Sequence, residues 1–358
     1  MPETFDLRPW PVCTNNVAWS ADNIVAVAVT GKMELQLPRY SRVGSTDRWT
    51  SLSIDVSSFT HDEIPLLDPA PWSSFDVGEE LSDKSVISHA WSPPGLGRHG
   101  ACVLAVLTSN HVLSLWSYSG RPDLSDDWNR VSIINDILNG THSSHRDARD
   151  GKRIHSFTWI PVPLTPNEQK GVHGRTALKT FYLAASDDLG NIHIIKISPA
   201  PSMSIEVIGT VTASHASGIA RPLFAALPSF VAAARPPPVD RLACGPWDLG
   251  PDGSLYATLA FARVGQVHTT KLRLVKQGRS IEADASTLVS IPHMPARISG
   301  PLQWAPRLGR SGSLLVFFST TSIYCLSVSP TIGVQLSARD FDTTWRQVAG
   351  TCDDQYCK

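Results

Sequence analysis

The fold is decided by residues 89–116, which read HAWSPPGLGRHGACVLAVLTSNHVLSLW. A Trp-Ser pair is followed by a turn rich in proline and glycine, and then by an unbroken apolar run over residues 102–107. A Thr-Ser-Asn turn leads to an alternating run over residues 112–116. An apolar run between turns is typical of a strand buried on both faces, and alternation is typical of a strand with one drier and one wetter face. The stretch predicts three consecutive strands.

The same pattern occurs five times along the chain, which makes an internal repeat the main organising feature. Successive marker tryptophans lie 72, 68, 88 and 57 residues apart, further than the roughly 40–45 residues of a WD-type blade. We therefore expect an all-β, WD-repeat-like β-propeller that forms a single domain over residues 1–358, with seven blades (six as the alternative). Loop insertions are expected near residues 58–88, 139–155, 161–178 and 219–243. The tryptophans that mark the blades are Trp19, Trp91, Trp159, Trp247 and Trp304.

Composition and charge exclude several classes of protein. The chain has 358 residues, of which 42% are hydrophobic, so disorder of the whole chain is excluded. The 31 basic and 32 acidic residues give a net charge of −1, which provides no overall attraction to nucleic acid or to an anionic membrane. No signal peptide or membrane span is apparent. The six cysteines form no Cys-x-x-Cys motif, so reduced thiols in the cytosol or nucleus are expected.

Two short motifs have a chemical and a structural interpretation. Residues 95–100 match G-x-G-x-x-G, but a dinucleotide site needs a strand before the motif and a helix after it. Prolines precede it and an apolar run follows it, so we interpret it as a turn. Asp187 and Asp188 could form an acid/base pair. The glycine that follows them at position 190 favours a β-turn in which the carboxylates accept hydrogen bonds from backbone amides.

Two further motifs are weak signals for metal binding and acyl transfer. His142 and His145 have neither the spacing of a helical metal pair nor that of a zinc finger, so a solvated loop is the better interpretation. Residues 347–352 resemble an acetyl-CoA-binding Q-x-x-G-x-G/A pattern, but cysteine occupies the last position. The sequence therefore predicts no catalytic residue, no cofactor and no metal.

One basic set is a candidate interaction surface because no acidic residue lies within it. Cations on an alternating strand can contact phosphates, although they also blunt the exposed edge of a sheet. Given the net charge, we expect the isolated chain to bind DNA poorly and to act through partners. The members of the basic set are Arg263, Lys271, Arg273, Lys276 and Arg279.

Residues 17–39, 89–116 and 127–131 resemble one family, the N-terminal propeller of the delta-type subunit of transcription factor IIIC in its fungal form. The resemblance covers roughly residues 10–200. It implies a nuclear, non-enzymatic scaffold that supports RNA polymerase III initiation at tRNA and 5S rRNA genes. The implied partners are other factor IIIC subunits, including a WD-repeat neighbour, with DNA reached indirectly. Two alternatives stay open: a WD-repeat-like scaffold of another nuclear or cytosolic complex, and the histone acetyltransferase activity attributed to the animal member.

Overall fold

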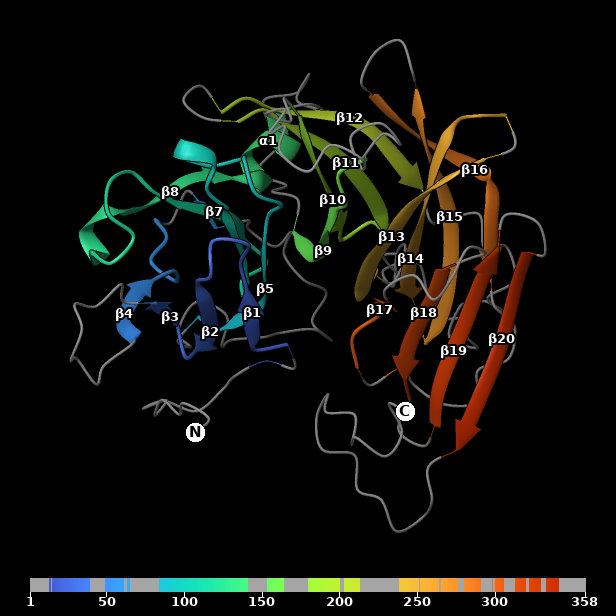
Figure 1. The fold of residues 1–358 in the computed structure, drawn as a ribbon, viewed down its shortest axis with the longest axis horizontal. Coiled ribbons are helices and arrows are strands. Elements are labelled where there is room, and N and C mark those ends of the chain that lie inside the picture. Colours follow the sequence, from blue (N-terminus) through green and yellow to red (C-terminus); the bar gives the residue numbers. More distant parts are fainter. Residues whose placement is uncertain are drawn as a thin grey trace, which may run out of the picture. The chain divides into compact units, whose positions relative to one another are not determined.

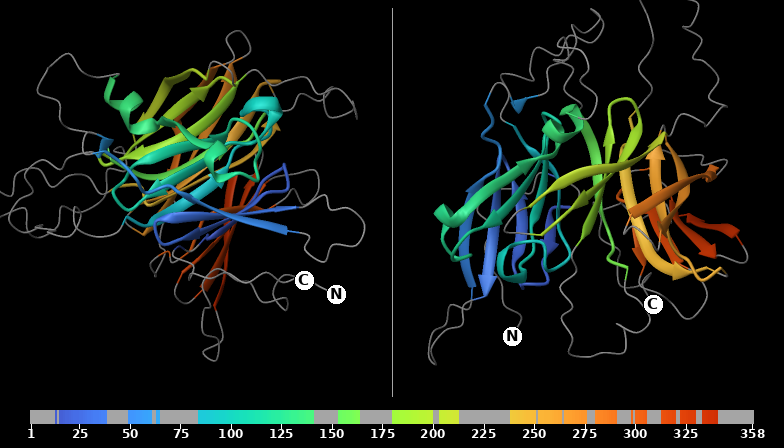
Figure 2. Two further views of the ribbon diagram at one scale, coloured as in Figure 1. Left: turned by 90° about the vertical axis from the view of Figure 1, so that its left-hand side faces the viewer. Right: turned by 90° about the horizontal axis from the view of Figure 1, so that it is seen from above.

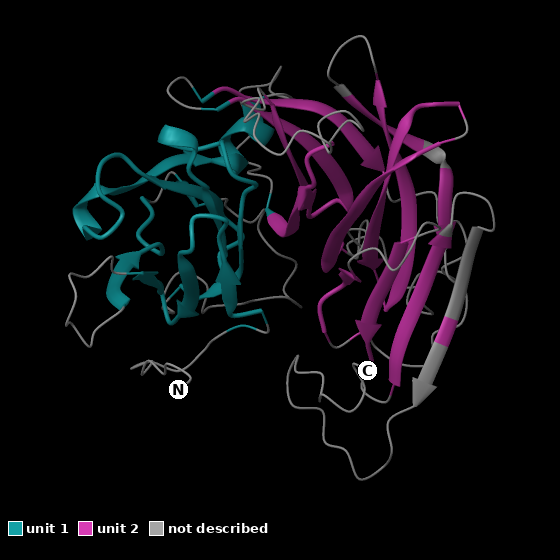
Figure 3. Ribbon diagram, viewed as in Figure 1, with its two compact units in different colours: residues 1–153, 199–203 teal, residues 154–198, 204–358 magenta. Residues whose placement is uncertain are grey.

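The computed structural model describes the chain in segments: residues 13, 15–38, 49–60, 63–64, 84–140, 153–163, 180–199, 203–212, 238–250, 252–263, 265–275, 280–290, 298, 300–305, 313–319, 322–329 and 333–340. These residues belong to two compact units (Figures 1 and 3). Unit 1 comprises residues 1–153 and 199–203, and unit 2 comprises residues 154–198 and 204–358. A single domain over residues 1–358 stays a prediction.

Unit 1 contains two four-stranded antiparallel sheets, each with its strands in chain order. The first sheet consists of β1 (Val17–Trp19), β2 (Val25–Val29), β3 (Lys32–Pro38) and β4 (Trp49–Asp55). The second consists of β5 (Val86–Trp91), β6 (Leu104–Thr108), β7 (Leu113–Tyr118) and β8 (Trp128–Ile133), and helix α1 (Ile134–Gly140) follows it.

Unit 2 contains three sheets of the same kind, whose strands are twisted in the views of Figure 2. The first is formed by β9 (Ile154–Ile160), β10 (Phe181–Asp187), β11 (Asn191–Ile197) and β12 (Ile205–Thr212). The second is formed by β13 (Arg241–Leu249), β14 (Leu255–Arg263), β15 (Gln266–Val275) and β16 (Ser280–Ser290). The third is formed by β17 (Gln303–Ala305), β18 (Ser313–Phe318), β19 (Ser322–Ser329) and β20 (Gly333–Asp340).

Burial explains why the middle strands are so apolar. Every residue of β2, β6 and β10 is buried, so both faces of these strands are covered. In unit 1, one core joins the β1–β4 sheet to the β5–β8 sheet through residues such as Ala26, Leu35 and Val106. In unit 2, one core joins the β9–β12 and β13–β16 sheets, and another joins the β13–β16 and β17–β20 sheets. Successive sheets within each unit therefore stack face to face.

The repeat predicted from the sequence is confirmed, with three differences. The described residues contain five four-stranded sheets, and the expected seven blades (or six) are not confirmed. Each sheet has a fourth strand, whereas the repeat predicts three strands per copy. Helix α1 interrupts the all-β pattern.

The expected insertions fall mostly outside the described residues, and strands occupy part of their predicted limits. The insertion placed at 58–88 overlaps β5, and the one placed at 139–155 overlaps both α1 and β9. The one placed at 219–243 overlaps the start of β13. Most of the segment expected at 161–178 is not described.

Candidate interaction surface and buried polar sites

Three of the five marker tryptophans contact the sheet that precedes their own sheet in the chain. Trp91 Nε1 donates a hydrogen bond to the Ala18 carbonyl at 3.2 Å, and Trp247 Nε1 donates one to the Pro161 carbonyl at 2.5 Å. The Trp304 ring packs against Gly245, where a Cβ atom would approach Trp304 Cδ2 to 3.0 Å. In each case a large aromatic side chain stabilises the stacking of two sheets.

The other two marker tryptophans differ from each other in exposure. Trp159 is only 9% exposed. Trp19 is 64% exposed, which is the largest value among the exposed large hydrophobic side chains of the described residues. Trp19 is therefore a marker by its place in the repeat, and it presents an aromatic surface to solvent.

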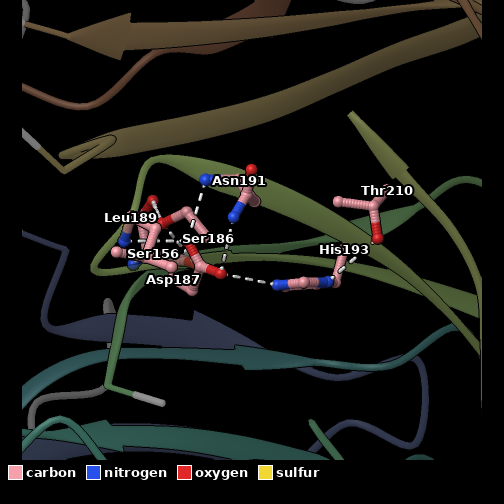
Figure 4. Close-up of polar contacts among 7 residues, drawn as sticks. All are labelled: Ser156, Ser186, Asp187, Leu189, Asn191, His193 and Thr210. Carbon is pink, nitrogen blue, oxygen red and sulfur yellow. Dashed lines mark hydrogen bonds and ion pairs between the residues drawn. The ribbon is translucent and has the colours of Figure 1, made fainter. Parts of the chain in front are cut away.

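The most elaborate polar cluster lies at the turn between β10 and β11 (Figure 4). Asp187 is fully buried, and its Oδ1 accepts hydrogen bonds from the backbone amides of Leu189 at 3.0 Å and Asn191 at 2.8 Å. Its Oδ2 lies 3.1 Å from Asn191 Nδ2 and 2.9 Å from His193 Nε2. The expected β-turn with a carboxylate that accepts backbone amides is thus confirmed for Asp187.

Burial and hydrogen bonding have opposite effects on the pKa of the Asp187 carboxylate, which accepts hydrogen bonds from four donors. Burial raises the pKa of Asp187, but the hydrogen bonds from His193 and Asn191 outweigh burial, so the pKa lies below its usual value. An ionised Asp187 then holds the turn and the neighbouring strand in place.

Asp187, His193 and Thr210 place a carboxylate, an imidazole and a hydroxyl in the order in which a catalytic triad has them. His193 Nδ1 lies 3.2 Å from Thr210 Oγ1 on β12, and Asp187 lies at the other end of the ring. His193 is only 2% exposed, and its cross-strand partner in the sheet is Thr210 itself. The arrangement therefore ties β10, β11 and β12 together across their faces.

Ser156 and Ser186 form a second buried contact in the same unit. Their hydroxyl oxygens are 2.8 Å apart, and both donate to the Val239 carbonyl, at 2.7 and 3.1 Å. Val239 lies just before β13, so these hydroxyls anchor the start of the next sheet. This is a structural use of serine, and the sequence offered no signal for it.

The described cysteines and one histidine are held in uncharged forms by burial. Among the described residues, Cys13, Cys102, Cys244 and Cys325 are free thiols. Burial, together with Asp22, raises the pKa of Cys102 to about 12. Burial lowers the pKa of His89 to about 4, and an interaction with the Ala26 backbone opposes this only in part. Cys102 and His89 are buried, whereas Cys13, Cys244 and Cys325 are partly buried.

The basic set predicted as an interaction surface is divided by the structure. Arg263 is buried at the end of β14, and burial lowers its pKa. Lys271 pairs across the strands with Asp284, and Arg273 pairs with Glu282. Arg273 Nη2 also lies 3.6 Å from Asp252 Oδ2. The remaining two members, Lys276 and Arg279, lie outside the described residues.

The other sequence motifs are either structural or not described. The glycine motif lies between β5 and β6, where Gly95 and Gly97 donate to the Ala101 carbonyl, so its interpretation as a turn is confirmed. His142, His145 and residues 347–352 lie outside the described residues. In the part of the chain that the structure describes, no three His, Cys, Asp or Glu side chains gather as a metal site. None of the described helices is long and apolar enough to cross a membrane.

Comparison with known proteins gives one family and several similar structures. The model of the transcription factor IIIC subunit delta beta-propeller domain matches residues 19–355. Comparison with curated proteins gives no match. Similar solved structures include the beta-propeller domain of Nup133 from Vanderwaltozyma polyspora, with a TM-score of 0.43, 8% identity, and coverage of 90% of this chain and 73% of that one. The Dos1 propeller has a TM-score of 0.40, 12% identity, and coverage of 91% of this chain and 60% of that one.

The family match extends over nearly the whole chain, and it includes all twenty strands apart from the first two residues of β1. The repeated four-stranded antiparallel sheets are the blades that a propeller requires. The chain therefore belongs to the family of transcription factor IIIC delta subunits, in its β-propeller domain.

Proposed function

We propose that this chain is a nuclear, non-enzymatic scaffold subunit of transcription factor IIIC, which holds other subunits together by protein–protein contacts. The observation that carries the proposal is the family match over residues 19–355. In this role the propeller supports initiation by RNA polymerase III at tRNA and 5S rRNA genes. Its partners are other factor IIIC subunits, including a WD-repeat neighbour.

The use of the polar residues supports a scaffold. Asp187 and His193 are buried side chains of the types used in acid–base catalysis. Their hydrogen bonds hold a turn and link three adjacent strands. The Ser156 and Ser186 hydroxyls are directed at a backbone carbonyl. Stacked sheets stabilised in this way offer rigid surfaces, and rigid surfaces suit the assembly of several partners.

Charge supports an indirect route to DNA. Non-specific affinity for DNA comes mainly from the neutralisation of phosphates by lysine and arginine. This chain has a net charge of −1, and both Lys271 and Arg273 face acidic residues across the sheet. The propeller therefore reaches promoters through subunits that bind DNA themselves.

Affinity purification of the full chain from nuclear extract tests the proposal. The tagged chain should recover the other factor IIIC subunits, and nuclease treatment should leave that recovery unchanged because the contacts are between proteins. A matched Trp247→Ala chain, in which the β9–β12 and β13–β16 sheets lose their indole contact, serves as a control for dependence on the folded propeller. Recovery of an unrelated complex, or loss of all subunits after nuclease treatment, would contradict the proposal.

A further inference from the structure

In unit 1, a short segment that follows β4 is held against β8 by the side chain of Arg130. Residues 58–60 and 63 of this segment are called the strap below. Arg130 Nη1 donates a hydrogen bond to the Ser58 carbonyl at 2.9 Å, and Arg130 Nη2 lies 2.5 Å from Glu63 Oε1. The Arg130 guanidinium also lies over the ring of Phe59, 5.0 Å from its centroid. One arginine therefore contacts three residues of the strap, through a hydrogen bond, an ion pair and a cation–π contact.

Glu63 connects Arg130 to the backbone of the strap. Glu63 Oε2 accepts a hydrogen bond from the Thr60 amide at 2.8 Å, and the Glu63 amide donates one to the Thr60 carbonyl at 3.1 Å. The Glu63 and Arg130 side chains are 24% and 22% exposed, so water and salt screen this ion pair only in part. The strap therefore depends on one carboxylate that bridges Thr60 and Arg130.

Thr60 has the surroundings of a residue that a protein kinase can modify. It is exposed, and it lies after β4 where the chain forms neither helix nor strand. The second and third residues after it are both acidic, Asp62 and Glu63. No other serine or threonine in the described part of the chain has acidic residues at both of these places. Kinases select their substrates by such charge patterns.

We propose that Thr60 is a phosphorylation site for an acid-directed serine/threonine kinase, and that the phosphate releases the strap from Arg130. The Thr60 Oγ1 atom attacks the γ-phosphorus of ATP and forms the new O–P bond. The bond between that phosphorus and the β–γ bridging oxygen breaks, ADP leaves, and the hydroxyl proton passes to the kinase. Because Glu63 is held by Arg130, the kinase captures the strap in its transiently released form.

Electrostatic repulsion is the reason for the release. A phosphate on Thr60 carries a charge of about −2 at pH 7 and sits on the residue whose amide binds the Glu63 carboxylate. Burial and the nearby Glu63 raise the pKa of Asp136, whereas Arg130 lowers it, so two carboxylates already lie close to one arginine. The phosphate adds a third anion, and a phosphate beside a glutamate disrupts the local structure. Glu63 then leaves the Thr60 amide, and the bridge to Arg130 is lost.

Phosphorylation of the purified full chain tests the site. The chain is incubated with ATP and a purified acid-directed serine/threonine kinase, and the phosphate is located by peptide mass spectrometry. The natural chain and Ser58→Ala should carry phosphate at residue 60, and Thr60→Val should not. Ser58 is the matched control because it is exposed and only two residues away, but has histidine at the third position after it. A natural chain without phosphate at residue 60 overturns the proposal.

The rate of phosphorylation tests whether Arg130 restrains the strap. Arg130→Gln removes the guanidinium and keeps both acidic residues that the kinase reads, so Thr60 should be phosphorylated about tenfold faster. Arg121→Gln is the control, because Arg121 forms a highly exposed ion pair with Asp123 in the same unit and should not affect the rate. Circular dichroism checks that both variants are folded. Equal rates in the natural chain and Arg130→Gln overturn the restraint.

Hydrogen exchange measures the release itself. The amides of Thr60 and Glu63, whose hydrogen bonds close the strap, should exchange about tenfold faster in the phosphorylated chain than in the unmodified one. The amides of β6, which is buried on both faces, are the internal reference and should exchange equally in both. Lys84 Nζ lies over the Phe59 ring at 5.7 Å and is a second cation at the strap. Unchanged or slower exchange at Thr60 and Glu63 overturns the release, because the phosphate then replaces Glu63 as the partner of these cations.

Discussion

Acidification should destabilise this protein through His89, and replacement of His89 by leucine should remove that effect. His89 lies on β5, is 5% exposed, and faces Val106 across the strands. Burial disfavours its charged form and lowers its pKa from 6.5 to about 4. His89→Leu replaces the imidazole by an apolar side chain that cannot bind a proton.

The direction and size of the effect follow from the two pKa values. Between pH 6.5 and about pH 4, the unfolded chain binds a proton at His89 and the folded chain does not. The contribution of His89 to the free energy of unfolding is therefore intact above pH 6.5 and falls by about 1.4 kcal/mol per pH unit below it. At pH 5.0 the loss relative to pH 7.5 amounts to about 2 kcal/mol.

Urea unfolding followed by tryptophan fluorescence at pH 7.5 and pH 5.0 measures this loss. The difference in unfolding free energy between the two pH values should be about 2 kcal/mol smaller in His89→Leu than in the natural chain. Burial and Arg263 also lower the pKa of His268. His268 therefore adds equally to the pH dependence of the unfolding free energy in both proteins, and its effect cancels in the comparison.

Val106→Ala is the matched control for packing at the same place. It removes buried methyl groups beside His89 and leaves the titration intact, so it should lower stability by about 1–3 kcal/mol at both pH values. An equal pH dependence in the natural chain and His89→Leu would refute the assignment of the acid sensitivity to His89.

Three further predictions concern the buried turn, the stacking of sheets and the charge of the chain. Asp187→Ala leaves four donors without their buried acceptor, so thermal or urea unfolding should show a loss of about 3 kcal/mol or more. Gly245→Ala brings a Cβ to 3.0 Å from the Trp304 ring, and should cost about 1–3 kcal/mol in the same assay. Replacement of Lys271 and Arg273 by glutamine should leave the weak binding of promoter DNA by the isolated chain unchanged in a mobility-shift titration.

Two of these predictions have a matched control substitution, and the third has a binding result that would contradict it. Asp188→Ala, next to Asp187 and half-buried, should cost less than Asp187→Ala, and equal losses would contradict the role of the buried carboxylate. Gly209→Ala, where the nearest atom lies 4.0 Å from a Cβ, should be milder than Gly245→Ala. Tight, salt-sensitive DNA binding that disappears with the glutamine replacements would contradict the indirect route to DNA.

The apolar strands and their turns could be predicted from the sequence because the relevant forces act locally. The apolar run at residues 102–107 corresponds to β6, which is buried on both faces. The run at residues 181–186 corresponds to β10, and the Asp187 turn follows it as expected. Short-range alternation and turn residues are sufficient for such strands.

The outer strands and the contacts between sheets could not be predicted in the same way. The fourth strands lie at the sheet edge, and β4 and β12 mix exposed and partly buried residues, so no clear apolar period marks them. The carbonyl partner of Trp91 is 73 residues away in the chain, and that of Trp247 is 86 residues away. The repeat identified these tryptophans as markers, but only the packed sheets reveal what each one contacts.

In the proposed function, this chain is a factor IIIC subunit needed for transcription by RNA polymerase III. The most direct measurement is the synthesis of tRNA and 5S rRNA precursors within minutes of acute depletion of the protein, with nascent messenger RNA as the internal reference. The account predicts that the tRNA and 5S rRNA precursors fall while nascent messenger RNA is maintained, and that the natural chain restores them. Unchanged synthesis of both precursors after complete depletion would contradict the claim.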